Sequence, residues 1–441
     1  MKNIHTLRAT MVAVVLATGS AAWATDGYFP HGFGMKAKGM GGASVAVTDN
    51  AFSGINNPAA SVWAGNRAEL GVDIFMPKRS AARSAPGLGG MLEGDVKSDG
   101  SAFAVPEFAY NRKIDDSMSW GVTVYGNGGM NTEYPGGNVT CSADGGVTTY
   151  QGNLLCGQGK LGVDLMQLII APTFAYKLAA QHSVGVSPLL VVQQFKATGL
   201  QAFTSTDPQS QMSANPAKVT NTGTDRSTGV GVRLGYLGQL SDTLKFGATY
   251  SPKIKMGKFD EYAGLFAGAG SFDIPENYAL GVNVQVTPAL SVAADYSRIN
   301  YSGVTSIGNP MSNLMSGNPM GSPNGPGFGW SDVSVIKVGV QWQATPTMVL
   351  RAGYNQSTNP VKPENVTFNI LAPGVITQHY TLGGTYALSK DSELTWAYMY
   401  APKSTVTGPS MYNGMMPGAS GITETIRMSQ QSLGVQYGWK F

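Results

Sequence analysis

The chain ends in Ser432-Leu433-Gly434-Val435-Gln436-Tyr437-Gly438-Trp439-Lys440-Phe441, a stretch that alternates strictly between two kinds of side chain. Leu433 and every second residue after it are large and apolar, whereas the residues between them are small or polar. Successive side chains of a β-strand point to opposite faces, so this stretch predicts a strand with one apolar and one polar face. An amphipathic edge strand of a soluble sandwich is the alternative for this segment taken alone.

The same alternation recurs further back along the chain, in residues 230–236, 244–250, 278–286, 336–342 and 348–354. A soluble core would not require so many strands to keep a polar row. A closed barrel in lipid does, because every backbone group must find a partner within the protein. The pattern therefore predicts a transmembrane β-barrel whose apolar rows face lipid.

The connections between these strands come in two lengths. Short turns are expected at residues 115–117, 180–181, 241–242, 287–288, 345–346 and 390–391. Long Gly-, Asn-, Pro- and Ser-rich loops are expected near 80–100, 131–162, 200–225, 260–270, 303–331, 359–374 and 409–423. Six turns alternating with seven loops predict an all-β fold, a 14-stranded antiparallel β-barrel over residues 67–441 with its first strand starting near Ala68. Short periplasmic turns and long external loops are typical of bacterial outer-membrane barrels.

The first residues have the features of a secretory signal peptide, predicted over residues 1–24. A positively charged start is followed by a short apolar run and by small residues at the cleavage positions, namely Lys2 and Arg8, Ala9 to Ala17, and Ala22-Trp23-Ala24. The apolar run is too short for a transmembrane helix, which needs about 20 residues. The chain is therefore expected to be exported, with the outer membrane of a Gram-negative cell as its destination.

The composition agrees with a membrane barrel and excludes several other classes. Charged residues make up only 12% of the chain, about half the usual share in soluble domains. A net charge of +3 without a basic cluster argues against a nucleic-acid partner. Cys141 and Cys156 lie in a Gly-rich stretch of an exported chain, so a loop disulfide is predicted in preference to two free thiols. Their spacing matches no zinc motif, and no metal or organic cofactor is expected.

Residues 25–66 precede the first strand and show no alternation. They are rich in glycine and in apolar side chains, which are Phe29, Phe33, Met35, Met40, Phe52, Ile55 and Trp63. A segment of this length could fold into the barrel from the periplasmic side as a hatch that fills the lumen. A disordered tail is the alternative, and the apolar content argues against it.

Three short motifs of this segment carry a resemblance. Gly39-Met40-Gly41-Gly42-Ala43, Asp49-Asn50-Ala51 and Asn57-Pro58-Ala59 together resemble the N-terminal hatch of FadL/TodX-type transporters. Further stretches that look like that family are 105–107, 125–133, 274–276, 350–354 and 359–361, so the resemblance covers essentially the whole mature chain. The terminal Phe441 also resembles the signal by which outer-membrane barrels engage the barrel assembly machinery. The resemblance implies hydrophobic small molecules as substrates, an outer-membrane lipid environment and a monomer.

The resemblance also implies a mechanism, passive uptake of long-chain fatty acids or of aromatic or aliphatic hydrocarbons by lateral diffusion through the barrel wall. External loops would catch the ligand and pass it to a pocket in the barrel. It would then leave sideways at a kink in the third strand, expected over residues 118–130, where Gly126, Gly128 and Gly129 permit a bend. Asn57, Pro58 and Ala59 would lie against that kink. The alternatives are that these glycines only lead the strand into its loop and that Asn57-Pro58 begins a plain turn.

Candidate ligand-binding residues fall into three groups. The hatch supplies Phe29, Phe33, Met35, Phe52 and Ile55, and the inward strand rows supply the cations Arg233, Lys337 and Arg351. A buried cation needs a carboxylate, either from a ligand or from a protein side chain such as inward Asp295. Apolar loop residues are candidates for ligand capture or for packing over the barrel mouth: Leu154, Leu155, Leu200, Phe203 and Met212, with Met311, Met315, Met320, Met411, Met415 and Met416.

Functions from other classes are less well supported. An enzyme is not expected, because His31, His182 and His379 stand in no spacing that suggests a catalytic triad and no convincing Gly-x-Ser-x-Gly elbow is present. A general porin would require a charge-rich constriction and no apolar plug. A surface adhesin barrel is the remaining alternative.

Overall fold

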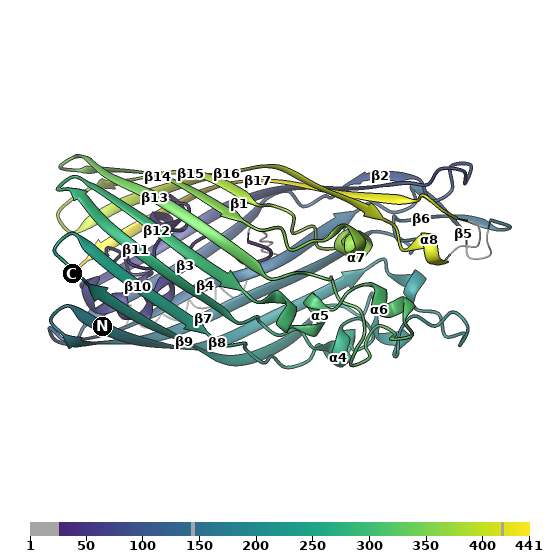
Figure 1. The fold of residues 1–441 in the computed structure, drawn as a ribbon, viewed down its shortest axis with the longest axis horizontal. Helices are drawn as coiled ribbons and strands as arrows, with labels where there is room; N and C mark the ends of the chain where they lie inside the picture. The colour runs from purple at the N-terminus through teal and green to yellow at the C-terminus, as the bar shows by residue number, and fades with distance from the viewer. Residues whose placement is uncertain (1–25, 143–145, 416–418) are drawn as a thin grey trace, which may run out of the picture.

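The computed structural model describes residues 26–142, 146–415 and 419–441, so the predicted signal peptide lies outside the described residues. Within these ranges, fourteen antiparallel strands form a closed barrel (Figure 1). They are β1 (Arg67–Ser84), β3 (Phe103–Lys113), β4 (Met118–Tyr134), β7 (Leu161–Ala179), β8 (His182–Thr198), β9 (Asp225–Gln239), β10 (Leu244–Ser251), β11 (Asn277–Thr287), β12 (Leu290–Ile299), β13 (Val333–Thr345), β14 (Met348–Ser357), β15 (Gln378–Ala387), β16 (Ser392–Pro409) and β17 (Thr423–Lys440). Each strand pairs with its sequence neighbour in the barrel, and β17 closes the ring on β1. The predicted fold class and strand number are confirmed.

Three short strands lie outside the ring. β2 (Gly94–Lys97) pairs with the outer end of β1, and β5 (Val139–Ser142) pairs with β6 (Thr149–Gly152) in the loop between β4 and β7. Cys141 and Cys156 form a disulfide in that same loop.

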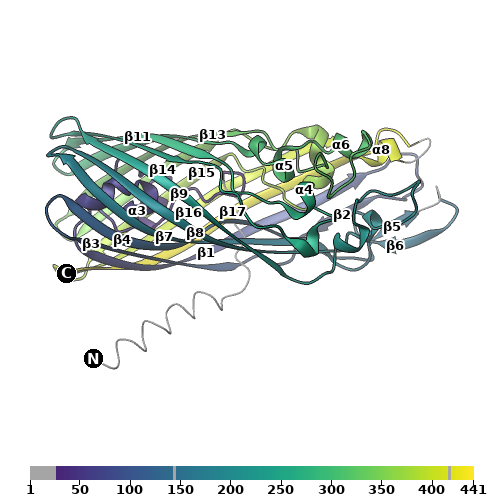
Figure 2. The same ribbon diagram turned by 90° about the horizontal axis from the view of Figure 1, so that it is seen from below.

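The two ends of the barrel differ as the spacing of turns predicts. All six short turns lie at one end, where the chain also enters β1 and leaves β17 (Figure 1, left). The long loops meet at the other end, where they carry the short helices α4 (Ala267–Gly270), α5 (Thr305–Gly308), α6 (Ser312–Met315), α7 (Val366–Asn369) and α8 (Tyr412–Met415) (Figure 2). Short turns mark the periplasmic end and long loops the external end of such barrels.

The alternating side chains sort as expected between the two faces of the wall. On β17, Leu433 and Trp439 are 50% and 56% exposed, whereas Ser432 and Gln436 are 3% and 2% exposed. The large apolar row therefore faces outward, where a soluble protein would meet water. Only lipid makes such a row favourable on every strand, which removes the soluble sandwich as an explanation.

Residues 26–66 fold inside the periplasmic half of the barrel (Figures 1 and 2). They contain α2 (Met35–Lys38), α3 (Ser53–Asn56) and η1 (Pro58–Trp63), and most of their side chains are buried. No helix among the described residues is long and apolar enough to span a membrane. We call this segment the hatch.

The hatch backbone touches the barrel wall at inward glycines. At Gly353, a Cβ atom would lie 2.1 Å from the backbone nitrogen of Gly41, so any side chain there would push the hatch away. Similar close approaches occur along much of the ring, at Gly185, Gly235, Gly247, Gly281, Gly339, Gly383 and Gly434. The small inward row seen in the sequence is thus the surface against which the hatch packs.

Candidate functional site

Ion pairs fix the hatch to the periplasmic half of the wall. The Lys38 ammonium in α2 lies 3.0 Å from Asp73 Oδ2 on β1 and 3.2 Å from Glu107 Oε2 on β3. All three side chains are almost completely buried, with exposed fractions of 3% or less. Desolvated charges of this kind are tolerated only in a geometry that keeps every partner in place.

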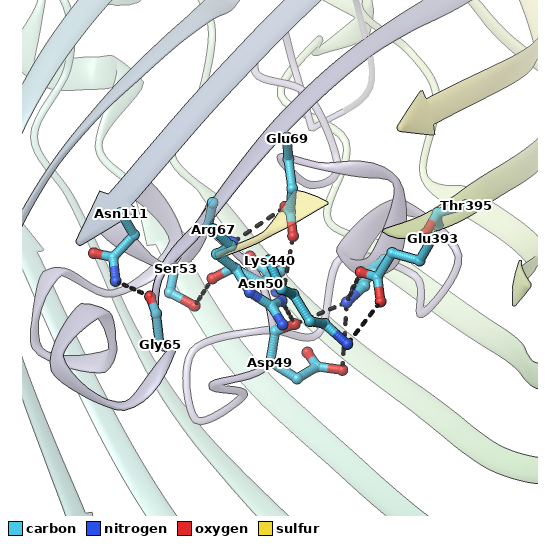
Figure 3. Close-up of polar contacts among 12 residues, drawn as sticks. Asp49, Asn50, Ser53, Gly65, Arg67, Glu69, Asn111, Glu393, Thr395 and Lys440 are labelled. Atoms are coloured by element: carbon cyan, nitrogen blue, oxygen red, sulfur yellow. Dashed lines mark hydrogen bonds and ion pairs between the residues drawn. The ribbon is translucent and has the colours of Figure 1, made fainter. Parts of the chain in front are cut away.

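A second group of charges links the hatch to the strands at which the barrel closes (Figure 3). Lys36 Nζ lies 2.7 Å from Glu393 Oε1 on β16, and Lys440 Nζ lies 3.3 Å from Glu393 Oε2. Glu69 Oε2 on β1 accepts a hydrogen bond from the backbone of Ala51 at 3.1 Å. β1 on one side of the closure and β16 on the other therefore both bind the hatch.

The three predicted inward cations also contact the hatch or its surroundings. Arg233 donates to the carbonyl of Ile55 at 2.7 Å, and Lys337 donates to the carbonyl of His31 at 2.8 Å. Arg351 Nη2 lies 3.8 Å from Asp49 Oδ2. All three cations thus contact hatch groups, in keeping with the structural alternative, while a contact with ligand stays a prediction.

Asp295 has a different partner from the one suggested by the sequence. Its Oδ2 accepts hydrogen bonds from the backbone nitrogens of Ser44 and Val45, at 2.6 and 3.0 Å. It stands opposite Lys337 in register and lines, with Arg233, a polar cavity of about 590 Å³ between the hatch and β9–β13.

The barrel wall has an unpaired seam between β3 and β4. These strands pair only where Phe108–Lys113 faces Ser119–Val124. Further out, residues 103–107 pair with β1 and residues 126–134 pair with β7, but no pairing between β3 and β4 is formed in the described structure. Asp99 bridges the outer end of this seam by donating its backbone N–H to the Glu133 carbonyl at 2.8 Å. The seam is a bounded stretch of wall in which the hydrogen-bond ladder is missing.

A bulge in β4 lies beside this seam. The register with β7 shifts between Gly126 and Gly128, so Asn127 is the additional residue. Asn127 points inward and donates to Gln167 Oε1 at 3.0 Å. Gly128 has φ +154°, and a Cβ there would lie 2.2 Å from the carbonyl oxygen of Tyr28. The bulge therefore turns the strand against the start of the hatch.

The predicted position of Asn57, Pro58 and Ala59 is wrong. Asn57 Nδ2 donates to the carbonyls of Val45 and Tyr236, at 2.8 and 2.9 Å, and the Pro58 backbone faces Gly185. These residues lie against β8 and β9, where Asn57 also caps η1 by accepting from the Ala59 N–H. The physical reason is that the hatch doubles back, so its first residues rather than its last reach the bulge.

Tyr28 and Phe33 are the hatch residues that lie at the bulge. Phe33 packs edge-on against Tyr125 with ring centroids 4.7 Å apart. Tyr28 contacts Gly128, and its ring belongs to an aromatic group with Tyr301 and Trp330, at centroid distances of 5.4 and 6.2 Å.

A small apolar cavity adjoins this group, and we call it the inner cavity. Its walls come from the hatch, from β1, β4 and β17, and from the loops before β13 and after β14: Tyr28, Phe75, Pro77, Arg79, Met130, Asn131, Trp330, Ala372, Pro373, Gly374 and Met428. Arg79 is its single charged side chain, and Arg79 Nη2 donates to the carbonyls of Asp99 and Gly100 at 2.9 and 2.7 Å. The inner cavity therefore lies behind the unpaired seam.

A second small apolar cavity lies further out among the external loops, and we call it the outer cavity. It contains no charged side chain, and its walls are Leu155, Val163, Phe195, Leu200, Phe203, Leu265, Phe266, Ser306, Met320, Pro326, Gly327, Phe328, Phe368 and Leu371. Four of the loop residues singled out from the sequence, Leu155, Leu200, Phe203 and Met320, thus share one cavity wall. Leu154 packs near Val139 instead, Met315 is half exposed, and Met416 lies outside the described residues.

The apolar hatch candidates do not gather around these two cavities. Met35, Phe52 and Ile55 are fully buried and line none of the cavities described here. Met35 packs on Gly434, and Phe52 packs on Gly34. Phe29 and Phe33 line the polar cavity. Five residues that line the inner cavity were not predicted from the sequence: Tyr28, Phe75, Met130, Trp330 and Met428. Only Phe75 and Met428, at inward positions of β1 and β17, belong to an alternating pattern.

Nothing in the described part of the chain suggests a metal centre, since no group of three or more His, Cys, Asp or Glu side chains could hold an ion there.

Comparison with known proteins adds an independent result. The family model described as outer membrane protein transport protein (OMPP1/FadL/TodX) matches residues 31–441. No sequence among the curated proteins matches the chain.

Solved structures with the same fold include three transporters. The toluene transporter TodX of P. putida is 20% identical, with a TM-score of 0.65 over 93% of this chain and 99% of that one. A FadL homologue of Pseudomonas aeruginosa is 15% identical, with a TM-score of 0.67 over 94% and 100%. The toluene transporter TbuX of Ralstonia pickettii is 17% identical, with a TM-score of 0.60 over 93% and 99%. At these identities the likeness establishes the fold.

Proposed function

Because the chain belongs to the OMPP1/FadL/TodX family of outer membrane transport proteins, we propose that it carries hydrophobic small molecules inward by lateral diffusion through its wall. The family is one of transport proteins rather than enzymes, and it places the barrel in the outer membrane of a Gram-negative cell. Long-chain fatty acids and aromatic or aliphatic hydrocarbons are the candidate ligands, in line with the toluene transporters among the structures of similar fold.

The observation that carries the proposal is the position of the inner cavity beside the unpaired seam. Phe75 on β1 and Met130 on β4 line this cavity, and at that level no backbone pairing joins β3, which lies between them, to β4. An apolar ligand gains nothing by entering water before it reaches the bilayer. A sideways exit into lipid therefore suits the apolar lining better than passage through the hatch.

Capture begins, in this proposal, at the outer cavity. Its walls come from several external loops and bear no charge, and a lining of apolar and aromatic side chains is typical of sites for apolar ligands. The ligand then moves inward past Phe328, Phe368 and Leu371 toward Trp330 and Ala372, since these neighbouring loop residues line the two cavities.

Below the inner cavity the hatch blocks the periplasmic route. For a ligand to pass, the ion pairs of Lys38 with Asp73 and Glu107 and that of Lys36 with Glu393 would have to be broken. Breaking a buried pair costs several kcal/mol, on the order of 3–5 kcal/mol each. The seam is therefore the easier exit, and we infer that the hatch stays in place during transport.

The test removes the bulge without touching either cavity. Deleting Asn127 restores the register of β4 against β7, and we expect uptake of labelled oleate or toluene to fall to that of cells without the protein. The matched control deletes Val286, which lies at the register shift between Gln285 and Thr287 on β11, far from the seam in the ring. The control should transport at the wild-type rate.

Surface abundance and heat-modifiable migration in electrophoresis establish that both deletion variants are folded in the membrane. Uptake that survives the Asn127 deletion would disprove the lateral route. Wild-type cells that take up neither compound would disprove both candidate ligand classes. Action as a monomer and recognition of Phe441 by the barrel assembly machinery remain parts of the proposal.

A further inference from the structure

The outer surface of the barrel has a clear upper limit to its apolar band. On neighbouring strands β14, β15 and β16, the outward residues Tyr354, Tyr380 and Tyr400 stand opposite one another in register. The same row continues through Gln431 on β17 to Met76 on β1. Tyrosine is enriched where the apolar core of a membrane meets the headgroups, so this row marks the external interface.

The length of β1 gives the same limit. Ala68 stands opposite Trp439 at the periplasmic end, and Lys78 lies ten residues further along the strand. At about 3.3 Å per residue and a strand tilt of about 40°, Lys78 is about 25 Å above Trp439. That distance is the height of the apolar band of such a barrel, about 25 Å.

Four cations lie immediately beyond this limit on adjacent strands. Lys78 on β1 is opposite Ser429, and Lys403 occupies the bulge of β16 beside Ser429. One row further out, Arg427 on β17 and Lys97 on β2 both stand opposite Ser80. Inward-facing Val96, Ile426 and Met428 alternate with these positions, so the cations point away from the lumen. We call the four side chains the basic patch.

No member of the basic patch forms an ion pair with a carboxylate of the described residues. The nearest carboxylates are Asp95 on the outer face of β2 and Glu93, which line a surface pocket with Arg427 without forming an ion pair within 4.0 Å, and Glu93 accepts a hydrogen bond from the backbone of Ala85. By contrast, Arg298 on β12 lies 3.0 Å from Asp332, and Lys196 on β8 stands opposite Asp164. Four adjacent cations without partners repel one another unless an anion lies between them.

From this charge and height we infer that the basic patch binds the phosphate groups of lipopolysaccharide in the outer leaflet. The acyl chains of such a lipid would lie along the apolar rows of β16, β17 and β1, which brings its phosphates to the level of Lys78 and Lys403. Arg427 and Lys97 would then contact phosphate or acidic sugar groups one row further out. Lysine and arginine bind phosphate by charge-assisted hydrogen bonds, and each basic side chain near an anionic surface adds to the attraction.

The inference does not depend on the transport route, although the patch lies close to the unpaired seam. β2 and β3 pair with the same edge of β1, so the lipid would be held one strand away from the stretch of wall where β4 has no partner on its β3 side.

The experiment measures lipid binding by the full-length mature protein in nanodiscs. The variant K78Q/K97Q/K403Q/R427Q removes the patch, and K196Q/R226Q/K255Q/K258Q removes four exposed cations from the opposite side as the matched control. The probes are phosphorylated lipid A, the same lipid A after removal of its phosphates, and phosphatidylglycerol. Heat-modifiable migration in electrophoresis shows that each variant is folded.

We expect the patch variant to bind phosphorylated lipid A at least about tenfold more weakly than wild type, and the control variant to stay within about twofold. Binding should also weaken with rising salt and when the phosphates are removed. The inference is overturned if the patch variant binds phosphorylated lipid A as tightly as wild type does. It is also overturned if the wild-type protein binds dephosphorylated lipid A, or phosphatidylglycerol, as tightly as phosphorylated lipid A. If the fourfold variant does not fold, the single changes K78Q and R427Q test the same point, with a loss of about two- to fivefold expected for each.

Discussion

The periplasmic and external halves of the lumen are filled by different chemistry. In the periplasmic half the hatch meets the wall through buried charges, such as Lys38 between Asp73 and Glu107, and through glycines that allow backbone contact. In the external half, loops enclose two small apolar cavities that aromatic and methionine side chains line. Buried charges demand one fixed arrangement, whereas apolar surfaces accept ligands of varied shape. The difference indicates a closed floor beneath an adaptable binding region.

The largest effect is expected from breaking the floor. Lys38→Met leaves Asp73 and Glu107 side by side without their cation, and loss of one partner of a buried ion pair costs about 3–5 kcal/mol. We expect a lower urea midpoint for unfolding and a rise in ion conductance across planar bilayers. Lys160→Met, which removes an exposed ion pair with Glu133, serves as the control and should change neither quantity. An unchanged midpoint for Lys38→Met would refute the view that these charges hold the hatch.

A smaller and more selective effect is expected from filling the inner cavity. Met130→Trp places a larger side chain in the small inner cavity, and overpacking of this kind costs about 1–3 kcal/mol. Uptake should fall by about tenfold while ion conductance stays at the wild-type level, because the hatch is untouched. Leu280→Trp on the lipid-facing side of β11, far from the bulge in the ring, is the control. Equal uptake by Met130→Trp and wild type would mean that ligands bypass the inner cavity.

The outer cavity should contribute mainly to capture. Phe203→Ala removes an aromatic side chain from its wall, and we expect the half-saturating ligand concentration to rise by about tenfold, with the maximal rate preserved. Saturation curves at several ligand concentrations separate these two quantities. Phe174→Ala, which removes an exposed ring on the lipid-facing surface, should leave both unchanged.

The smallest effect is expected from opening the disulfide. Cys141 and Cys156 close a loop that carries Leu155 into the outer cavity, so the double change to serine loosens one wall of that cavity. We expect uptake at low ligand concentration to fall by about two- to threefold, since a cross-link acts mainly by restricting alternative loop conformations. Treating the wild-type protein with a reductant should reproduce the loss. A larger loss in the variant than after reduction would indicate a fault in assembly instead.

The fold could be predicted from the sequence because its periodicity is local. The residue types along β17 alone indicate which side chains face lipid and which face the lumen. Between other strands, turns such as 180–181 interrupt the alternation. The hatch offers no such period. Its apolar residues therefore look like ligand contacts in the sequence, although Phe52 and Ile55 are fully buried within the folded protein.

The site depends on contacts that no local pattern contains. Tyr28 donates its backbone N–H to Tyr301, 273 residues away, and reaches the bulge of β4 only because the hatch doubles back. The motif around Asn57 predicts a position at that bulge, but the side-chain amide of Asn57 donates to the carbonyls of Val45 and Tyr236. The bulge itself was expected from glycines in one strand, whereas the absence of β3 partners opposite them depends on where another strand stops.

The inward glycines have a consequence for the order of events during biogenesis. A hatch that meets the backbone at Gly185, Gly353 and Gly434, on widely separated strands, cannot slide into a finished cylinder past the side chains between them. The eighteen residue pairs that join β1 to β17 must therefore form around a hatch that is already seated. Closure of the ring and folding of its plug are then a single cooperative step, and a substitution at either one should delay the appearance of both.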